Sequence, residues 1–126
     1  MHDGSHMTLT LETLGVGTGW SCLLVGEDVE EASVRLQERV GPGARVLVAG
    51  TVLPDGPFDF IWARGPSDDL ARLVERLWFG GLILVEDTDA DGDTLAARLA
   101  AAGLAGAQAG AGMAHGRRPQ GTYNLW

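Results

Sequence analysis

The sequence predicts an α/β protein built around a mostly parallel β-sheet. Two short apolar runs, Phe58–Ala63 and Leu82–Val85, have the length and composition of buried strands. Between them lies an amphipathic segment, Asp68–Trp78, whose leucines recur at helical spacing. A strand, a crossover helix and a second strand form the repeating unit of parallel sheets. We therefore expect ligands to bind at the carboxyl ends of the strands, as they do in open sheets of this kind.

The elements before this unit continue the same alternation. Thr8–Leu14 alternates in polarity and predicts a strand, and a glycine-rich turn follows at residues 15–19. Trp20–Val25 is apolar and is compatible with either a strand or the start of a helix. Glu27–Val40 predicts a helix, because its apolar residues are spaced three and four apart and acids occupy its first turn. Arg45–Gly50 predicts another buried strand.

The C-terminal part completes a single domain, for which we expect about five or six strands and about three helices in all. Thr94–Ala102 predicts a helix, and residues 106–112 are compatible with either a thin strand or a loop. Thr122–Trp126 predicts a terminal strand. Residues 1–7 resemble an expression-vector remnant, so the predicted domain spans residues 8–126.

Composition excludes several classes of function. The 126 residues carry a formal net charge of −8 and no lysine. Such a chain lacks the positive surface that binds nucleic acid or an anionic membrane. No apolar run approaches the roughly 18 residues of a membrane span. The single cysteine, Cys22, excludes an internal disulfide and is expected as a small apolar core residue in a reducing compartment. We expect a cytoplasmic protein, and the abundance of Gly and Ala favours a bacterial source.

Three stretches carry a resemblance to a known family. Gly15-Val16-Gly17-Thr18-Gly19 is similar to a G-x-G-x-G loop, Leu53–Ile61 to the approach to a fourth strand, and Leu77–Glu86 to a fifth strand that opens on Gly-Gly. Together they resemble class I S-adenosylmethionine-dependent methyltransferases. The resemblance implies a three-layer Rossmann-like domain with S-adenosylmethionine as cofactor. It also implies that Gly15, Gly17 and Gly19 bind the methionine part of the cofactor.

The chain is reduced relative to the full methyltransferase fold. Thr13 stands where the family has an acid before the glycine loop. Only residues 20–26 separate that loop from Glu27 and Asp28, and so few residues cannot form both a helix and a strand. One strand–helix element is therefore expected to be missing.

Two assignments of the missing element are open. In one, Trp20–Val25 is the second strand and the first helix is lost; in the other, residues 20–40 form one long first helix. We favour the first, because the step from Arg45–Gly50 to the next strand has the family's spacing between its third and fourth strands. On that alignment the resemblance implies that Glu27 or Asp28 binds the cofactor's ribose.

Other candidate sites are weaker. The Asp87–Asp93 loop has oxygen ligands at alternate positions before a glycine, as in a calcium loop. The twelfth position is Arg98 rather than Glu, so we expect no metal and predict that Asp91 or Asp93 caps the following helix.

The remaining side chains of interest have structural explanations as well. His115 could serve as a general base but is expected in an exposed glycine-rich loop, and Arg117-Arg118-Pro119 is expected in a solvated turn. Of the four tryptophans, Trp20 and Trp62 fall near predicted strand ends, and core packing is the expectation for both.

Three hypotheses of function follow. The first is a small methyltransferase-like protein that binds S-adenosylmethionine and methylates a small molecule or a protein. The second is a non-catalytic scaffold of the same fold, which acts as a homodimer or as a companion subunit. The third is a receiver-like signalling domain. In each case we expect a homo-oligomer or a protein partner, because a missing element leaves apolar sheet to be covered.

Overall fold

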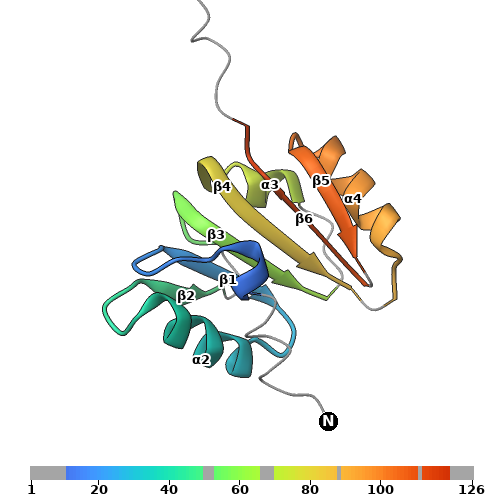
Figure 1. Ribbon diagram of the computed structural model, residues 1–126. Coiled ribbons are helices and arrows are strands. Elements are labelled where there is room, and N and C mark those ends of the chain that lie inside the picture. Colours follow the sequence, from blue (N-terminus) through green and yellow to red (C-terminus); the bar gives the residue numbers. More distant parts are fainter. Residues whose placement is uncertain (1–10, 50–52, 66–69, 88, 111, 120–126) are drawn as a thin grey trace, which may run out of the picture.

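The computed structural model contains one six-stranded sheet in the order β2-β1-β3-β4-β6-β5 (Figure 1). It describes residues 11–49, 53–65, 70–87, 89–110 and 112–119. The strands are β1 (Cys22–Gly26), β2 (Val46–Val48), β3 (Phe58–Arg64), β4 (Leu77–Glu86), β5 (Ala105–Gly110) and β6 (Met113–Arg117). The helices are α2 (Val29–Val40), α3 (Leu70–Val74) and α4 (Gly92–Ala101).

The order of strands corrects the assignment of the missing element. Strands β2, β1, β3 and β4 are parallel, and β1 lies between β2 and β3. In a doubly wound sheet of order 3-2-1-4-5-6, the strand that borders strand four is strand one. Residues 20–25 do contribute a strand, but it occupies the first position and not the second. The missing element is therefore the third strand, whose place beyond β2 is the edge of the sheet.

Two apolar cores show that the fold has three layers. On one face α2 packs against alternate residues of β1, β3 and β4, through Ala32, Leu36 and Val40. On the other face α3 and α4 cover the intervening residues of the same strands. Figure 1 shows α2 on one side of the sheet, with α3 and α4 on the other. The predicted reduced Rossmann-like fold is confirmed, and no helix of the described residues is long and apolar enough to cross a membrane.

The N-terminal segment is helical where a strand was predicted. Residues 11–14 are helical, and the amide of Gly15 donates to the carbonyl oxygen of Leu11 at 3.1 Å. Leu11 is buried in the core beneath α2. Leu11 and Leu14 are three residues apart, a spacing that also suits a helix. The burial of Leu11 in the core decides in favour of the helix. Residues 1–10, which include all of the predicted remnant, lie outside the described residues.

The second half differs from the prediction in two places. The helix predicted over Asp68–Trp78 is limited to α3, because the amide of Phe58 donates to the carbonyl oxygen of Arg76 and so starts the pairing of β3 with β4. The glycine-rich tail forms two strands, since β6 runs antiparallel to β4 and β5 pairs with β6. The predicted terminal strand Thr122–Trp126 lies outside the described residues.

Candidate functional site

The carboxyl ends of β1 and β3 mark the place where a sheet of this type binds ligands. The chain leaves β1 towards β2 on one side, and β3 lies on the other side, so the two connections diverge here. Such a switch point leaves a crevice outside the strand ends. Three short stretches line it: Gly26-Glu27-Asp28 after β1, Arg64-Gly65 at the end of β3, and Glu86 at the end of β4.

The backbones at this switch point are in close contact. Gly26 has a φ of 106°, and a β-carbon there would collide with the carbonyl oxygen of Arg64. The amide of Glu27 donates to that same oxygen at 2.9 Å. Glycine is required at position 26 for both reasons, because other residues rarely adopt this φ and none would fit. The two strands therefore stay together one residue beyond the end of the ladder.

The side chain of Arg64 crosses the crevice. Its Nη1 donates to the carbonyl oxygen of Asp28 at 2.6 Å, at the start of α2. Its Nε donates to Oε1 of Glu86 at 3.1 Å, and the indole Nε1 of Trp62 donates to the same oxygen at 2.6 Å. The guanidinium also lies over the Trp62 ring, 5.4 Å from its centroid. One cation thus joins the ends of β1, β3 and β4.

The side chain of Glu27 lies against Gly65, the residue after Arg64. A β-carbon on Gly65 would lie only 2.9 Å from the Glu27 carboxyl carbon, so the Glu27 side chain rests on Gly65. Gly65 has a φ of 90°, which also favours glycine. Glu27 itself is exposed, so its side chain lies against Gly65 at the surface of the molecule.

The start of α2 is acidic. Asp28 is in the left-handed region with a φ of 51°, and its side chain forms no capping hydrogen bond. Glu30 and Glu31 stand in the first turn. These carboxylates are stabilised by the positive end of the helix dipole. A carboxylate ligand at the same helix end would meet the negative charge of these side chains beside the amides of the first turn.

The glycine loop lies at the opposite edge of the sheet. The amide of Gly19 donates to the carbonyl oxygen of Val40 at 2.8 Å, at the end of α2. A β-carbon on Gly17 would lie 2.9 Å from Nε1 of Trp20, so the indole rests on this loop. The loop follows helical residues 11–14 instead of a strand. This finding removes the basis on which the loop was compared with a loop after strand one.

The structure therefore does not bring the predicted site residues together. Gly15, Gly17 and Gly19 precede β1, and Glu27 and Asp28 follow it. The five residues of β1 separate the two groups by about 16 Å. In the corrected strand order, the position directly after the second strand, where we expected the ribose acid, is Ala49, and residues 50–52 lie outside the described residues.

The Asp87–Asp93 loop has the predicted capping role. Oδ1 of Asp91 accepts a hydrogen bond from the amide of Thr94 at 2.7 Å, and this bond lowers the pKa of the Asp91 carboxyl. Asp87 is buried, and its Oδ1 accepts from the amide of Asp89 at 3.0 Å. Within the described part of the chain, His, Cys, Asp and Glu side chains form no group of three or more that could hold a metal ion.

Two residues with candidate chemistry lie in strands. An exposed loop was predicted for His115, but the residue is half-buried in β6, opposite Leu84. Burial, and to a smaller extent the nearby charge of Arg117, lowers the pKa of His115. Cys22 is buried in β1, as predicted, and burial together with Asp59 raises the pKa of its thiol to about 12. A thiol with this pKa is protonated at neutral pH and is a poor nucleophile.

Arg64 and Glu86, which meet at the carboxyl ends of the strands, were not among the predicted site residues. The available signal was a charged residue directly after each of two buried strands. Two parallel strands adjacent in the sheet bring such residues to one edge. The arginine doublet was also misjudged: Arg117 lies in β6, and Arg118 donates to the carbonyl oxygens of Glu75 and Leu77, so neither forms a solvated turn.

Solved structures similar to this chain are S-adenosylmethionine-dependent methyltransferases. A candidate methyltransferase from Pseudomonas syringae matches with a TM-score of 0.54 and 17% identity, over 90% of this chain and 97% of that one. Coclaurine N-methyltransferase, bound to N-methylheliamine and SAH, matches with a TM-score of 0.54 and 14% identity, over 66% of this chain and 35% of that one. PigF with SAH matches with a TM-score of 0.51 and 14% identity, over 91% and 56%.

These matches establish the fold as that of class I methyltransferases. The chain spans about a third of coclaurine N-methyltransferase and just over half of PigF, but nearly all of the Pseudomonas syringae protein. No family model matches the chain, and no curated protein does.

Proposed function

We propose that this protein is a non-catalytic scaffold with a methyltransferase-like fold, which acts through association with protein and not through methyl transfer. The observation that carries the proposal is the Arg64 bridge. In the crevice where a sheet of this order binds ligands, the guanidinium of Arg64 joins Asp28 to Glu86. The cation is held by partners within the chain, so a ligand would have to break those bonds to enter.

The described residues do not fit the cofactor that the fold implies. S-adenosylmethionine has a carboxylate, which is best held by free amides at a helix N-terminus. Here Asp28, Glu30 and Glu31 place negative charge at that terminus, and this charge would repel the carboxylate of the ligand. The glycines that could approach a ligand closely, at positions 15, 17 and 19, lie at the other edge of the sheet.

The alternative, a methyltransferase-like protein that binds S-adenosylmethionine, is supported by the neighbours in complex with SAH. The receiver-like alternative is not supported, because β6 and β5 are antiparallel where a flavodoxin-like sheet of order 2-1-3-4-5 is parallel. The choice thus lies between two functions of one fold.

Isothermal titration calorimetry with S-adenosylmethionine and with S-adenosylhomocysteine separates these two functions. We expect no saturable heat with either compound at millimolar concentration. Micromolar binding that is lost in Gly17→Asp would instead support the glycine loop as a cofactor site. Micromolar binding that survives Gly17→Asp and is lost in Glu27→Gln would place the cofactor at the carboxyl edge. Either result would overturn the scaffold proposal.

A further inference from the structure

A bulge at the start of β4 projects two aromatic side chains from the sheet. Phe58 of β3 pairs with Leu77, but Phe60 pairs with Leu82, so β4 has three extra residues in this interval. The two glycines explain how the chain accommodates them. Gly80 has a φ of 84°, and a β-carbon on Gly81 would lie 2.9 Å from the carbonyl oxygen of Trp78. Bulges of this kind redirect side chains and are typical of functional surfaces.

The bulge is held firmly by β6 and the residue after it. The amide of Gly80 donates to the carbonyl oxygen of Arg118 at 2.7 Å, and the amide of Arg118 donates to the carbonyl oxygen of Gly81 at 2.8 Å. Nη1 of Arg117 donates to the carbonyl oxygen of Gly80 at 3.0 Å. The backbone that presents the aromatic residues is therefore fixed, so a partner would not have to order it.

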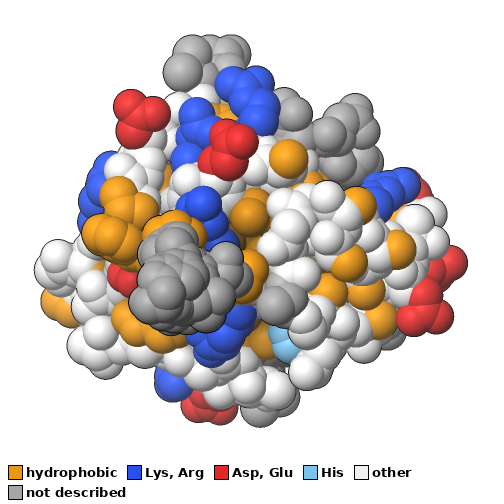
Figure 2. All heavy atoms as spheres, turned by 90° about the horizontal axis from the view of Figure 1, so that it is seen from above, with side chains coloured by type: hydrophobic (Ala, Val, Ile, Leu, Met, Phe, Trp, Pro, Cys, Tyr) orange, Lys and Arg blue, Asp and Glu red, His pale blue; other side chains and the backbone are white. Residues whose placement is uncertain are grey.

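Trp78 and Phe79 are exposed by 53% and 49%. Exposed tryptophan next to arginine is typical of the few residues that dominate protein interfaces. The Arg118 guanidinium lies over the Phe79 ring, 4.6 Å from its centroid. Figure 2, seen from above the view of Figure 1, shows arginine side chains (blue) interspersed with hydrophobic ones (orange).

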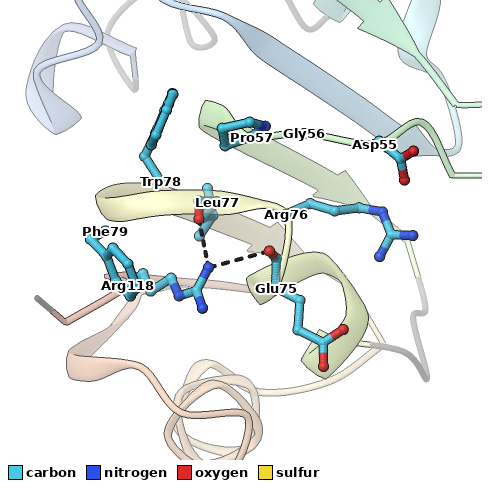
Figure 3. A pocket seen from close by; sticks show the side chains of 9 residues that line it. All are labelled: Asp55, Gly56, Pro57, Glu75, Arg76, Leu77, Trp78, Phe79 and Arg118. Atoms are coloured by element: carbon cyan, nitrogen blue, oxygen red, sulfur yellow. Dashed lines mark hydrogen bonds between the residues drawn. The ribbon is translucent and has the colours of Figure 1, made fainter. Parts of the chain in front are cut away.

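A pocket of about 480 Å³ lies beside the bulge and carries charges of both signs (Figure 3). Arg76 and Arg118 donate to carbonyl oxygens, and neither forms an ion pair with a described residue. Asp55 and Glu75 are exposed, and within the described residues neither carboxylate is in an ion pair. In Figure 3 the Glu75 carboxylate points away from Trp78, and Asp55 lies on the same side of the view as the guanidinium of Arg76.

We propose that this surface binds a second copy of the chain about a two-fold axis. In a two-fold interface the same patch is used by both partners, so residue i of one copy meets residue j of the other and the reverse. The carboxylates of one copy can then form ion pairs with the guanidiniums of the other, around the aromatic residues. Within one chain the structure shows no ion pair among these described groups, which belong to Asp55, Glu75, Arg76 and Arg118. An acidic or a basic partner would meet like charge from half of this set. The inference rests on the proposed function, because it names the protein with which the scaffold associates. Its test is separate from the cofactor titration, because the bulge lies at the start of β4 and Arg64 bridges the opposite ends of the strands.

Sedimentation velocity over a concentration series from micromolar to millimolar tests the inference. We expect a monomer–dimer equilibrium for the wild type and at least a tenfold weaker dimer for Trp78→Ala. Val34→Ser is the matched control, because Val34 on α2 is exposed by 54% and should leave the dimer unchanged. Far-UV circular dichroism and urea midpoints establish that both variants are folded.

Charge reversal gives a second measurement that does not alter the aromatic residues. The Glu75 carboxylate has no partner among the described residues, so Glu75→Arg should keep the fold and weaken the dimer. Added salt should weaken the wild-type dimer as well, because exposed ion pairs are screened. A wild type that remains monomeric at millimolar concentration would overturn the inference. So would a dimer that Trp78→Ala and Glu75→Arg both leave unchanged.

Discussion

Glu86 is the acceptor on which the carboxyl edge depends, so Glu86→Ala should be strongly destabilising. Oε1 of Glu86 accepts from the indole of Trp62 at 2.6 Å and from Nε of Arg64 at 3.1 Å. Trp62 is only 1% exposed, so its N–H would be left buried without an acceptor. The Arg64–Glu86 pair is also largely withdrawn from water, with side chains exposed by 19% and 20%.

The magnitude follows from these two contacts. A hydrogen bond to a charged group contributes about 1.5–3 kcal/mol, and an unsatisfied buried donor costs about 1–3 kcal/mol. The two contacts share one oxygen, so their effects overlap and we expect a loss of about 3 kcal/mol for Glu86→Ala. Glu86→Gln keeps an acceptor for the indole and should cost about half as much.

Urea unfolding followed by far-UV circular dichroism measures this loss. Glu31→Ala is the control, because Glu31 pairs with Arg35 across an exposed turn of α2 at 3.8 Å and should change stability by less than about 0.5 kcal/mol. A Glu86→Ala variant as stable as Glu31→Ala would refute the bridge as a real feature of the fold. A Trp62→Phe, Glu86→Ala double variant that is additive would refute the indole contact specifically.

Three further predictions concern the bulge, the buried thiol and the strand histidine. Gly81→Ala should lower the free energy of unfolding, measured in urea, by about 1–3 kcal/mol, because the new β-carbon would meet backbone atoms. Gly43→Ala is the control, because a β-carbon there meets nothing within 4 Å. Equal stabilities of the two variants would contradict the bulge. Cys22, with a thiol pKa of about 12, should react with a thiol reagent at pH 8 only as fast as the protein opens, and immediate labelling in native buffer would contradict its burial. The folded-state pKa of His115 lies below its ordinary value. At pH values between these two pKa values, the unfolded chain therefore binds more protons than the folded chain. Stability should therefore fall as pH drops through and below the ordinary histidine range, and His115→Gln should remove that dependence; an unchanged pH profile in the variant would exclude His115 as its source.

The apolar runs were sufficient to locate the strands but not their lateral order. Phe58–Ala63 and Leu82–Val85 were predicted as strands and lie in β3 and β4. Residues 20–25 were left open between strand and helix, with strand favoured, and they contribute β1. Their periodicity says nothing about which strand borders which. The second position assigned to residues 20–25 came from spacing in the sequence, and the pairing of Cys22 with Phe60 overturns it.

Elements whose conformation depends on tertiary contacts could not be predicted. Leu77 fits the helical spacing of α3, yet it pairs with Phe58 and begins β4. The segment Met113–Arg117 has little strand propensity, and its pairing with β4 makes it β6. The placement of the glycine loop could not be predicted for the same reason. The glycine loop has the right composition, but helical residues precede it, and its glycines lie where no strand ends.

The central claim is that Arg64 bridges the carboxyl ends of the strands, through Asp28 and Glu86, where a cofactor would bind. Residue-resolved NMR most directly tests it, by following backbone amide and arginine Nε–Hε signals of the ¹⁵N-labelled protein during titration with S-adenosylhomocysteine. Our account predicts that the amides of Glu27 and Gly65 and the Nε–Hε of Arg64 do not shift at millimolar ligand. Saturable shifts of these three signals, with the Arg64 signal moving as its bond to Glu86 breaks, would show that the crevice opens to the cofactor and would contradict the account.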